Sequence, residues 1–465
     1  MANTNFIAAV DLGSSYITGI VGAKNDSGGL TILACEREHS ANSIRRGVIY
    51  NVEDAAFQIS SLIKKLENKI PGASIIKVYV GVGGQSLRSI DHVVAKSLGA
   101  EGVVGADVVD GLYKECKNYK PEGLDVLSIV SPIYSVDGKQ EVNPVGVSCS
   151  RIEAHYKLIV CRPSVRRNII NSINERVKKD VVGIIVSPLA LSDVVLSDDE
   201  KELGCALIDF GGGVTSLTIF KNKRLVGMCV VPLGASLITK DMVTLNMVEA
   251  EAERVKIAYG DVVLDKENDE LVEINTANGS QRKAKVSEIN VVVEARVQEI
   301  VENVIVRLEE YIQPGDLGAG VIIAGGGASL KNLDEHIRKR LKTEVRHATV
   351  RKGLIERSNV SVEPELAVAI GLLSKGSINC AYTPPTPPTP PVMTVRKEEP
   401  PVVPEKEMEE VVTVEDDPTP VTTKSGDNKK KNKKSSFLEK VSGMLFDGEE
   451  MGGSRNKKNN SEDED

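Results

Sequence analysis

Residues 206–220 read ALIDFGGGVTSLTIF, in which an apolar strand runs into an aspartate and three consecutive glycines before a second apolar strand begins. Glycines at such a turn leave backbone N–H groups accessible, so that an anion can approach them closely. Asp209 stands beside them and would repel a polyphosphate unless a cation lay between the two. The stretch therefore predicts a β-hairpin whose turn binds phosphate together with a metal ion.

A second copy of this pattern occurs near the start of the sequence, where residues 8–21 read AAVDLGSSYITGIV. Both copies run strand, aspartate, apolar residue, glycine, two small residues and strand, which indicates an internal duplication. A single copy is more often an ordinary glycine turn, but two matched copies favour two hairpins that clamp phosphates from opposite sides. Asp11 and Asp209 would then hold Mg²⁺ through water, because Mg²⁺ prefers oxygen ligands and keeps several waters.

A third glycine cluster, GAGVIIAGGGASLKNL at residues 318–333, leads from a strand into a helix. Gly325, Gly326 and Gly327 leave a flat backbone surface on which a base can stack, and the new helix offers unpaired N–H groups. The alternative is a Rossmann dinucleotide fingerprint with Glu344 as its acidic residue. That alternative is disfavoured because Leu330 occupies the position of the third glycine and because the cluster is not the first strand-to-helix turn of a domain.

The composition of the 465 residues limits the class of protein. A hydrophobic fraction of 41% is enough for a sizeable core, and a net charge of -8 argues against general binding of nucleic acid. The seven cysteines are scattered without a CxxC pair, which favours free thiols over disulfides or a zinc site. No leader is evident, and no segment approaches the ~18 apolar residues of a membrane span. We therefore expect a protein of the cytosol.

Strand-like and helix-like segments alternate through residues 5–378, which is typical of an α/β protein. Residues 52–70, VEDAAFQISSLIKKLENKI, carry apolar side chains at helical spacing. A β-rich stretch at residues 126–161 interrupts the alternation and contains a hairpin signal at Asp137-Gly138. After residue 380 the composition changes, since more than half of the 20 prolines lie in residues 381–420.

The hairpins and the third cluster are similar to motifs of the superfamily of actin, Hsp70 and sugar kinases, whose two lobes close over MgATP. Within it, residues 5–378 most resemble the FtsA family of bacterial cell-division proteins. The phosphate motifs indicate only the superfamily, whereas VDGKQEVNPVGVSCSRIEAHYKLIV at 136–160 resembles the FtsA subdomain called 1C. The resemblance implies an α/β, two-lobed actin-like fold, which is a duplicated ribonuclease H-like ATPase fold, with subdomain 1C replacing the corresponding subdomain of actin.

The resemblance also implies how the chain is divided. Subdomain 1A would comprise residues 1–84 and 166–198, subdomain 1C residues 85–165, subdomain 2A residues 199–235 and 305–378, and subdomain 2B residues 236–304. A disordered Pro-rich and basic linker at 379–434, a short amphipathic membrane-targeting helix at 435–447 and a disordered polar tail at 448–465 would follow.

The same resemblance assigns a set of nucleotide-binding residues. Glu253 and Lys256 in EAERVKIAYG match helix positions that contact ribose and base, and their i, i+3 spacing puts both on one helix face. A plain surface ion pair is the alternative for these two. The predicted set comprises Asp11, Gly13, Ser14, Ser15, Asp209, Gly211, Gly212, Gly213, Glu253, Lys256, Gly325, Gly326 and Gly327.

Two departures from the family pattern bear on chemistry. Many relatives have lysine where this chain has Tyr16, and a Thr-x-Asp where it has Val214 and Ser216. Losing a cation and a hydroxyl near the phosphates weakens stabilisation of a phosphoryl-transfer transition state more than it weakens binding. We therefore expect ATP to bind and its hydrolysis to be weak or absent, and we name no catalytic residue.

The stretch SSFLEKVSGMLF near the C-terminus predicts an amphipathic helix. Phe446 falls off the apolar face, and a helix this short needs a surface against which to fold. An anionic membrane is the favoured surface, because Lys433 and Lys434 belong to a lysine cluster that precedes the helix. Docking onto its own core or onto a protein groove is the alternative. The predicted apolar face consists of Phe437, Leu438, Val441, Met444 and Leu445.

The resemblance implies a protein that tethers polymers of the tubulin-like protein FtsZ to the inner face of the cytoplasmic membrane at the division site. The FtsZ C-terminal tail would bind subdomain 2B, and further partners would be copies of the chain itself in filaments, anionic lipids and other division proteins. Nucleic acid is not an expected partner. The alternatives are a small-molecule kinase of the superfamily, which has no use for the C-terminal segment, and a pilus-assembly actin homologue.

Overall fold

The first hairpin motif lies in the middle of a six-stranded mixed sheet with the order β11-β6-β1-β2-β3-β19. In the computed structural model, which describes residues 5–40, 43–99, 102–263, 270–276 and 278–382, β1 pairs antiparallel with β2 and parallel with β6. The motif is thus a true hairpin at the centre of a lobe. The strands are β1 (Ile7–Leu12), β2 (Tyr16–Lys24), β3 (Leu30–His39), β6 (Lys77–Val82), β11 (Asp180–Val186) and β19 (Ile355–Ser358).

Helices cover both faces of this first sheet. Helix α1 (Val52–Lys69) begins where the Asn51 side chain accepts hydrogen bonds from two backbone N–H groups of its first turn. A Cβ on Gly19 of β2 would crowd Leu62 and Leu66 of α1, whereas one on Gly22 would crowd Leu373 of α10 (Ala367–Lys375). Residues three apart in a strand point to opposite faces, so α1 and α10 pack on opposite sides. Helix α4 (Ser187–Val195) packs beside α10.

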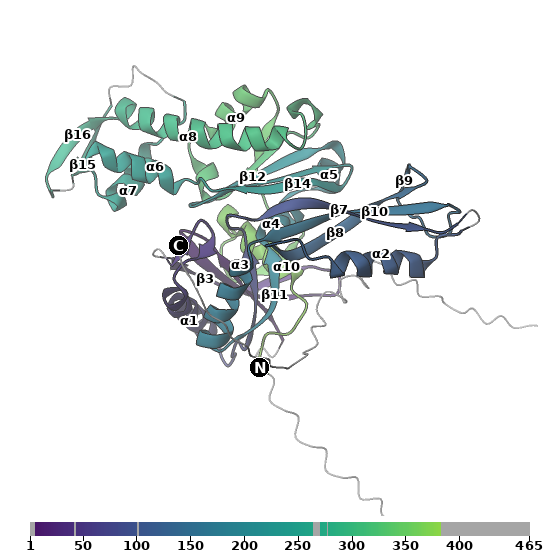
Figure 1. Cartoon of the computed structure of the whole chain (residues 1–465). Helices are drawn as coiled ribbons and strands as arrows, with labels where there is room; N and C mark the ends of the chain where they lie inside the picture. The colour runs from purple at the N-terminus through teal and green to yellow at the C-terminus, as the bar shows by residue number, and fades with distance from the viewer. Residues whose placement is uncertain (1–4, 41–42, 100–101, 264–269, 277, 383–465) are drawn as a thin grey trace, which may run out of the picture. The chain divides into compact units, whose positions relative to one another are not determined.

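The second hairpin motif lies in a nine-stranded sheet with the order β18-β17-β12-β13-β14-β7-β10-β8-β9. Strand β12 pairs antiparallel with β13 and parallel with β17, as β1 does with β2 and β6, so the two lobes repeat one pattern. Helix α8 (Val286–Glu309) packs along β13 and β14, and α9 (Leu333–Leu341) packs on β18 (Figure 1). The first five strands are β12 (Cys205–Phe210), β13 (Thr215–Lys221), β14 (Arg224–Val231), β17 (Val321–Ala324) and β18 (Val345–His347).

The other four strands of this sheet come from a segment inserted between β6 and α3 (Pro163–Ile170). The turn expected at Asp137-Gly138 joins β8 to β9, and both residues have positive φ, at 46° and 82°. Apolar residues of α2 (Ala106–Asn118) pack on the inserted strands in a core of their own. The strands are β7 (Arg88–Ser97), β8 (Asp125–Val136), β9 (Lys139–Glu141) and β10 (Arg151–Cys161).

The inserted strands are joined to the second lobe through β7 and β14. Arg88 of β7 pairs with Cys229 of β14. Next to this pair, the Ser89 hydroxyl accepts a hydrogen bond from the Met228 N–H at 2.9 Å and donates one to the Met228 carbonyl at 3.3 Å. Both residues are buried. The sheet is therefore continuous from the second lobe into the insertion.

The segment between β14 and β17 builds a small unit next to the second lobe. Its helices α6 (Ser236–Met242) and α7 (Glu249–Tyr259) pack against each other, and α6 also packs on α8. A two-stranded antiparallel sheet of β15 (Leu271–Asn275) and β16 (Gln281–Lys285) completes it. The remaining elements are β4 (Ile44–Arg45), β5 (Val48–Ile49), a π-helix (Asn171–Val177), α5 (Asp198–Leu203) and short 3-10 helices.

The structure differs from the expected division of the chain after residue 350. We expected residues 305–378 to belong to the second lobe, but β19 joins the first sheet beside β3, and α10 packs on β1 and β2. The physical reason is that α10 is apolar on nearly all sides. Six of its nine residues are buried, Gly371 among them. A helix of this kind needs partners on several faces, and the first sheet with α4 supplies them.

The expected linker also begins later than residue 379. Cys380 and Ala381 are buried, the Cys380 N–H donates to the Phe6 carbonyl at 2.8 Å, and the Cys380 carbonyl accepts from Ile76 N–H at 3.0 Å. Cys380 and Ala381 therefore belong to the core of the first lobe, and the exposed Tyr382 follows them. The rest of the predicted linker, the helix predicted at 435–447 and the polar tail lie outside the described residues. No helix in the described part of the chain has both the length and the apolar character needed to cross a membrane.

We expect Ser89→Ala to lower the free energy of unfolding by about 1 to 3 kcal/mol, because it leaves the buried Met228 N–H without its partner, while the Met228 carbonyl keeps the Tyr311 hydroxyl at 3.5 Å. Urea unfolding followed by circular dichroism measures the effect. Ser97→Ala, at the exposed end of the same strand, is the matched control and should change stability by less than about 0.5 kcal/mol. Equal stability of the two variants would contradict the role given to Ser89 in joining β7 to β14.

Candidate functional site

The turns of the two hairpins meet face to face. A Cβ on Gly212 would overlap Ser15 Oγ, and a Cβ on Gly213 would overlap Ser14 Oγ. In the first turn, a Cβ on Gly13 would lie 2.5 Å from the carbonyl oxygen of Tyr16. No side chain fits at Gly212 or Gly213 without movement of the opposite turn, and none fits at Gly13 without movement of its own turn. The glycines thus allow the backbones of the two lobes to approach each other at the bottom of the cleft between them.

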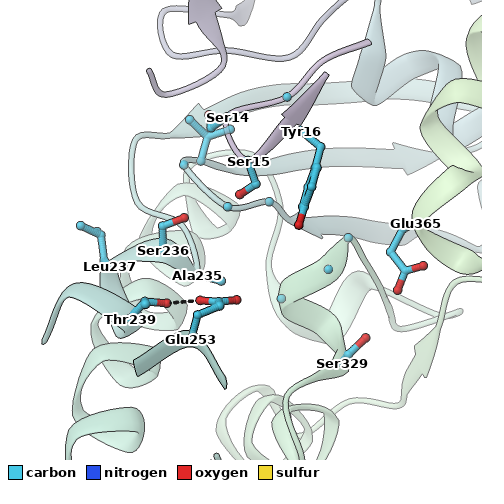
Figure 2. A pocket seen from close by; sticks show the side chains of 18 of the residues that line it. Ser14, Ser15, Tyr16, Ala235, Ser236, Leu237, Thr239, Glu253, Ser329 and Glu365 are labelled. Carbon is cyan, nitrogen blue, oxygen red and sulfur yellow. Dashed lines mark hydrogen bonds between the residues drawn. The ribbon is translucent and has the colours of Figure 1, made fainter. Parts of the chain in front are cut away.

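The cleft above these turns has a volume of about 1990 Å³. It is larger than the ~300–1,000 Å³ usual for small-molecule pockets. Every residue that the sequence analysis assigned to nucleotide binding lines this cleft. In Figure 2, Ser14, Ser15 and Tyr16 lie on one side of it and Thr239 and Glu253 on the facing side. Residues far apart in the sequence are therefore brought to one site, as the duplicated motif predicted.

The two aspartates of the hairpins lie at the bottom of the cleft. Ser187 Oγ donates a hydrogen bond to Asp11 Oδ1 at 2.9 Å. Burial raises the pKa of Asp11, and this hydrogen bond opposes the increase in part. Burial, together with the negative charge of Asp11, raises the pKa of Asp209 to about 7. Two carboxylates thus face one site, and no basic side chain among the described residues forms an ion pair with either of them.

Glu253 and Lys256 lie on the wall of the cleft and are not a plain surface pair. Lys256 is only 7% exposed, and its ammonium group donates to Glu253 Oε2 at 2.6 Å and to Thr239 Oγ1 at 3.0 Å. The Thr239 hydroxyl in turn donates to Glu253 (Figure 2). Thr239 comes from α6, so the network fixes α7 against α6. The sequence analysis missed Thr239, since the stretch SLITKDM carries no signal for it.

The third glycine cluster differs from the expected strand-to-helix step. After β17 the chain forms a 3-10 turn at Gly326–Ser329, and α9 begins only at Leu333. The chain does not enter a helix at once, since Asn332 adopts the left-handed conformation with φ of 61°, and Lys331 and Asn332 each lie 2.8 Å from one carboxylate oxygen of Asp261. The N–H groups of α9 therefore do not follow the glycines directly. The 3-10 turn takes the place that we expected for the start of the helix.

The glycines of this cluster nevertheless line the cleft beside the second hairpin. Gly325 has φ of 83° and passes so close to Asp209 and Phe210 that a Cβ would overlap both. By contrast, a Cβ on Gly326 would meet no atom within 4 Å, so this backbone is open to the cleft. The contact with a hairpin turn does not fit the Rossmann alternative, in which a glycine turn opens directly into a helix that binds the pyrophosphate.

Tyr16 is the residue that replaces the lysine expected from the family pattern. Its ring lies edge to face on His39, with the ring centroids 5.3 Å apart, and it lines the cleft. Nearby, the Thr215 hydroxyl donates to the Leu233 carbonyl at 2.9 Å, while Ser216 lines the cleft. The two hairpin turns, residues 13–16 and 211–214, therefore offer hydroxyl and backbone groups to the site and carry no basic side chain.

Two lobes built on the same strand pattern, with facing turns at the bottom of one cleft, define a protein of the actin-like fold. A chain in a solved PilM-PilN type IV pilus biogenesis complex has this fold, with a TM-score of 0.55 over 79% of this chain and 97% of that one at 14% identity. The family model described as "Cell division protein FtsA" matches residues 206–371, and the model "SHS2 domain inserted in FTSA" matches residues 84–160.

Curated relatives agree with these matches. "Cell division protein FtsA" of Porphyromonas gingivalis is 35% identical over 406 residues, which are 86% of this chain and 84% of the relative. The protein of the same name from Bacillus subtilis is 30% identical over 357 residues, or 75% of this chain and 80% of the relative. The chain therefore belongs to the FtsA family of cell-division proteins.

At pH 8, without nucleotide or divalent cation, we expect Asp209→Asn to raise the free energy of unfolding by about 1 to 3 kcal/mol. The amide removes a negative charge that burial and Asp11 both disfavour. Because the pKa is raised from 3.8 to about 7, wild type loses stability as the pH rises between these values and no further above them. The advantage of the variant should therefore disappear as the pH is lowered towards 4.

Urea unfolding at several pH values measures this difference. Asp26→Asn, at an exposed position in the turn after β2, is the matched control and should have no effect larger than about 0.5 kcal/mol. If Asp209→Asn is less stable than wild type at pH 8, the carboxylate is stabilised in the folded protein, and the electrostatic conflict with Asp11 does not exist.

Proposed function

We propose that the cleft binds ATP, with its phosphates held between the two hairpin turns. The observation that supports this most strongly is the approach of Gly212 and Gly213 to Ser15 and Ser14, which gathers backbone and hydroxyl groups from both lobes at one point. Such groups bind phosphate oxygens without requiring any one side chain. Glu253 and Lys256 line the same cleft and would contact ribose and base, and Gly325 to Gly327 would offer the surface for the base.

Mg²⁺ fits the same cleft. Asp11 and Asp209 face it. Burial raises the pKa of both carboxyl groups, and the charge of Asp11 raises that of Asp209 further, so a divalent cation would favour their ionised forms. Mg²⁺ is commonly bound through one or two carboxylates, waters and substrate phosphates, which is the ligand set this cleft would provide with ATP. When bound, the ion would neutralise phosphate charge. We infer that nucleotide occupancy sets lobe closure, with hydrolysis weak or absent.

We further propose that the protein tethers FtsZ polymers to the inner face of the bacterial cytoplasmic membrane at the division site. Membership of the FtsA family supports this role. The tail of FtsZ would bind residues 236–304, where the structure has exposed apolar side chains that suit a peptide partner, such as Leu271 of β15 at 55% and Val291 of α8 at 51%. The protein would also assemble with copies of itself and with other division proteins.

The membrane contact would be made by residues 435–447, in the part of the sequence outside the described structure. Burying the five apolar side chains of the predicted face gives roughly 7 to 15 kcal/mol, but ordering about ten residues costs roughly 10 to 20 kcal/mol, so burial alone does not suffice. The lysines of KKKNKK at 429–434 would add ~1 kcal/mol each near anionic lipid. Each copy thus attaches weakly, and a filament of many copies attaches firmly.

To test nucleotide binding, we expect Gly326→Ala to weaken MgATP binding by about tenfold, because the added methyl group enters the space for the ligand. Nothing in the protein opposes this methyl group, so the folded state should remain intact. Isothermal titration with MgATP gives the affinity, and a thermal melt checks the fold. Gly111→Ala in α2, which is equally open and does not line the cleft, should bind as wild type does. Failure of wild type to bind MgATP would refute the proposal.

Flotation with liposomes tests the tether. The full chain should float with anionic vesicles, more so with MgATP, and should carry FtsZ with it, because avidity strengthens a weak anchor. A chain that ends at Lys434 and the variant Phe437→Glu should both remain in solution, and neutral vesicles should float less protein. Flotation of the truncated chain would place the membrane contact elsewhere, and an FtsZ without its C-terminal tail should not be recruited.

A further inference from the structure

A small hairpin outside the two phosphate motifs reaches the centre of the cleft. Strands β4 and β5 pair as Ile44 with Ile49 and Arg45 with Val48, which leaves Arg46 and Gly47 as a two-residue turn. Their φ values of 51° and 69° are the combination that a type I′ turn requires. Arginine is unusual at such a position, where asparagine or glycine is preferred. The chain therefore accepts a less favourable residue at the tip of this hairpin.

The tip is held on two sides by backbone hydrogen bonds. Gly47 N–H donates to Ser14 Oγ at 2.7 Å, and Gln85 N–H donates to the Arg46 carbonyl at 2.8 Å. A Cβ on Gly47 would lie 2.6 Å from Gly84 Cα, so the turn is pressed against the loop after β6. These contacts fix the position of the Arg46 backbone beside the first phosphate turn, independently of its side chain.

Arg46 also touches the second phosphate turn. A Cβ on Gly213 would lie 3.3 Å from Arg46 Cα. Arg46 is exposed and lines the cleft, and its Nη1 atom makes a long contact of 3.5 Å with Gln85 Oε1. The hairpin thus places an arginine where the turns of both lobes meet, with its guanidinium held weakly by the protein itself.

Positive charge beside the two turns would favour an anionic ligand, and Arg46 shares the cleft with other basic residues, namely Arg37, Arg45, Lys240, Lys256 and Lys331. Asp11 and Asp209 contribute negative charge, Tyr16 contributes none, and Lys256 is paired with Glu253. An arginine presents a planar set of N–H donors that matches phosphate oxygens. The base would lie near α7 and Gly325 to Gly327. The opposite end of ATP, its γ-phosphate, would then point towards the hairpin of β4 and β5.

We propose that Arg46 binds the γ-phosphate of ATP, which ADP lacks, and supplies the positive charge that is missing at the position of Tyr16. The inference rests on the proposed binding of ATP and adds to it a residue that distinguishes ATP from ADP. Because Arg46 belongs to the first lobe and contacts the turn of the second, its bond to the terminal phosphate would favour the closed arrangement of the lobes only while that phosphate is present.

Arg46→Asn tests this role without damage to the turn, since Asn-Gly is the preferred pair in a type I′ hairpin. Arg45→Gln is the matched control: it removes the same charge from the neighbouring residue, which also lines the cleft but whose guanidinium stacks 3.8 Å above the ring of Tyr50. Arg46→Lys keeps the charge and loses the planar set of donors. Affinities of the full-length proteins for MgATP and MgADP are measured by isothermal titration, with a thermal melt of each variant.

We expect Arg46→Asn to weaken MgATP binding by about tenfold to hundredfold, the effect of losing a charge-assisted hydrogen bond. MgADP binding should change by less than about threefold, Arg46→Lys should fall between wild type and Arg46→Asn, and Arg45→Gln should stay within about threefold of wild type. Three results would each overturn this inference and leave the proposed function intact. They are equal losses of affinity in Arg46→Asn and Arg45→Gln, equal losses of affinity for ATP and for ADP, and no loss of affinity in Arg46→Asn. If wild type binds neither nucleotide, the proposed function fails and the inference fails with it.

Discussion

The close approach of two glycine-bearing turns is the constraint on which the site depends. Gly212 and Gly213 lie so near Ser15 and Ser14 that the two turns meet at the bottom of the cleft. A side chain at either glycine would push the two turns apart. Each turn is carried by a hairpin in the middle of its sheet, and buried strands on both sides fix its place. The precision of the site therefore comes from two hydrophobic cores, while Gly212, Gly213, Ser14 and Ser15 at the meeting point of the turns are small.

Much of this arrangement was predictable from the sequence because its signals are local. The alternation of strand residues, the aspartate at the end of each first strand and the glycines between strands are all contained within fifteen residues of each other. The duplication then implied that Asp11 and Asp209 occupy equivalent places, and both line the cleft. Helix α1 was equally accessible to prediction, since its apolar positions recur at helical spacing and its cap lies at Asn51.

What escaped prediction depends on contacts between distant parts of the chain. The return of α10 to the first sheet has no sequence signal other than a strongly apolar helix, which any sheet could have buried. The late start of α9 accompanies contacts of Lys331 and Asn332 with Asp261, which lies about seventy positions earlier in the chain. The role of Thr239 likewise follows from the packing of α6 on α7. Patterns within one element cannot reveal constraints that only the assembled fold imposes.

The pairing of β7 with β14 has a mechanical consequence. The chain enters the inserted strands from β6 and leaves them into α3, both of which belong to the first lobe, yet the strands continue the sheet of the second. The insertion is thus a lever with its covalent attachments on one lobe and its hydrogen-bonded attachment on the other. Any rotation that opens or closes the cleft must bend the two connections at its base or tilt the whole insertion. A small displacement at the cleft would then become a larger one at the far end of the lever, near β9.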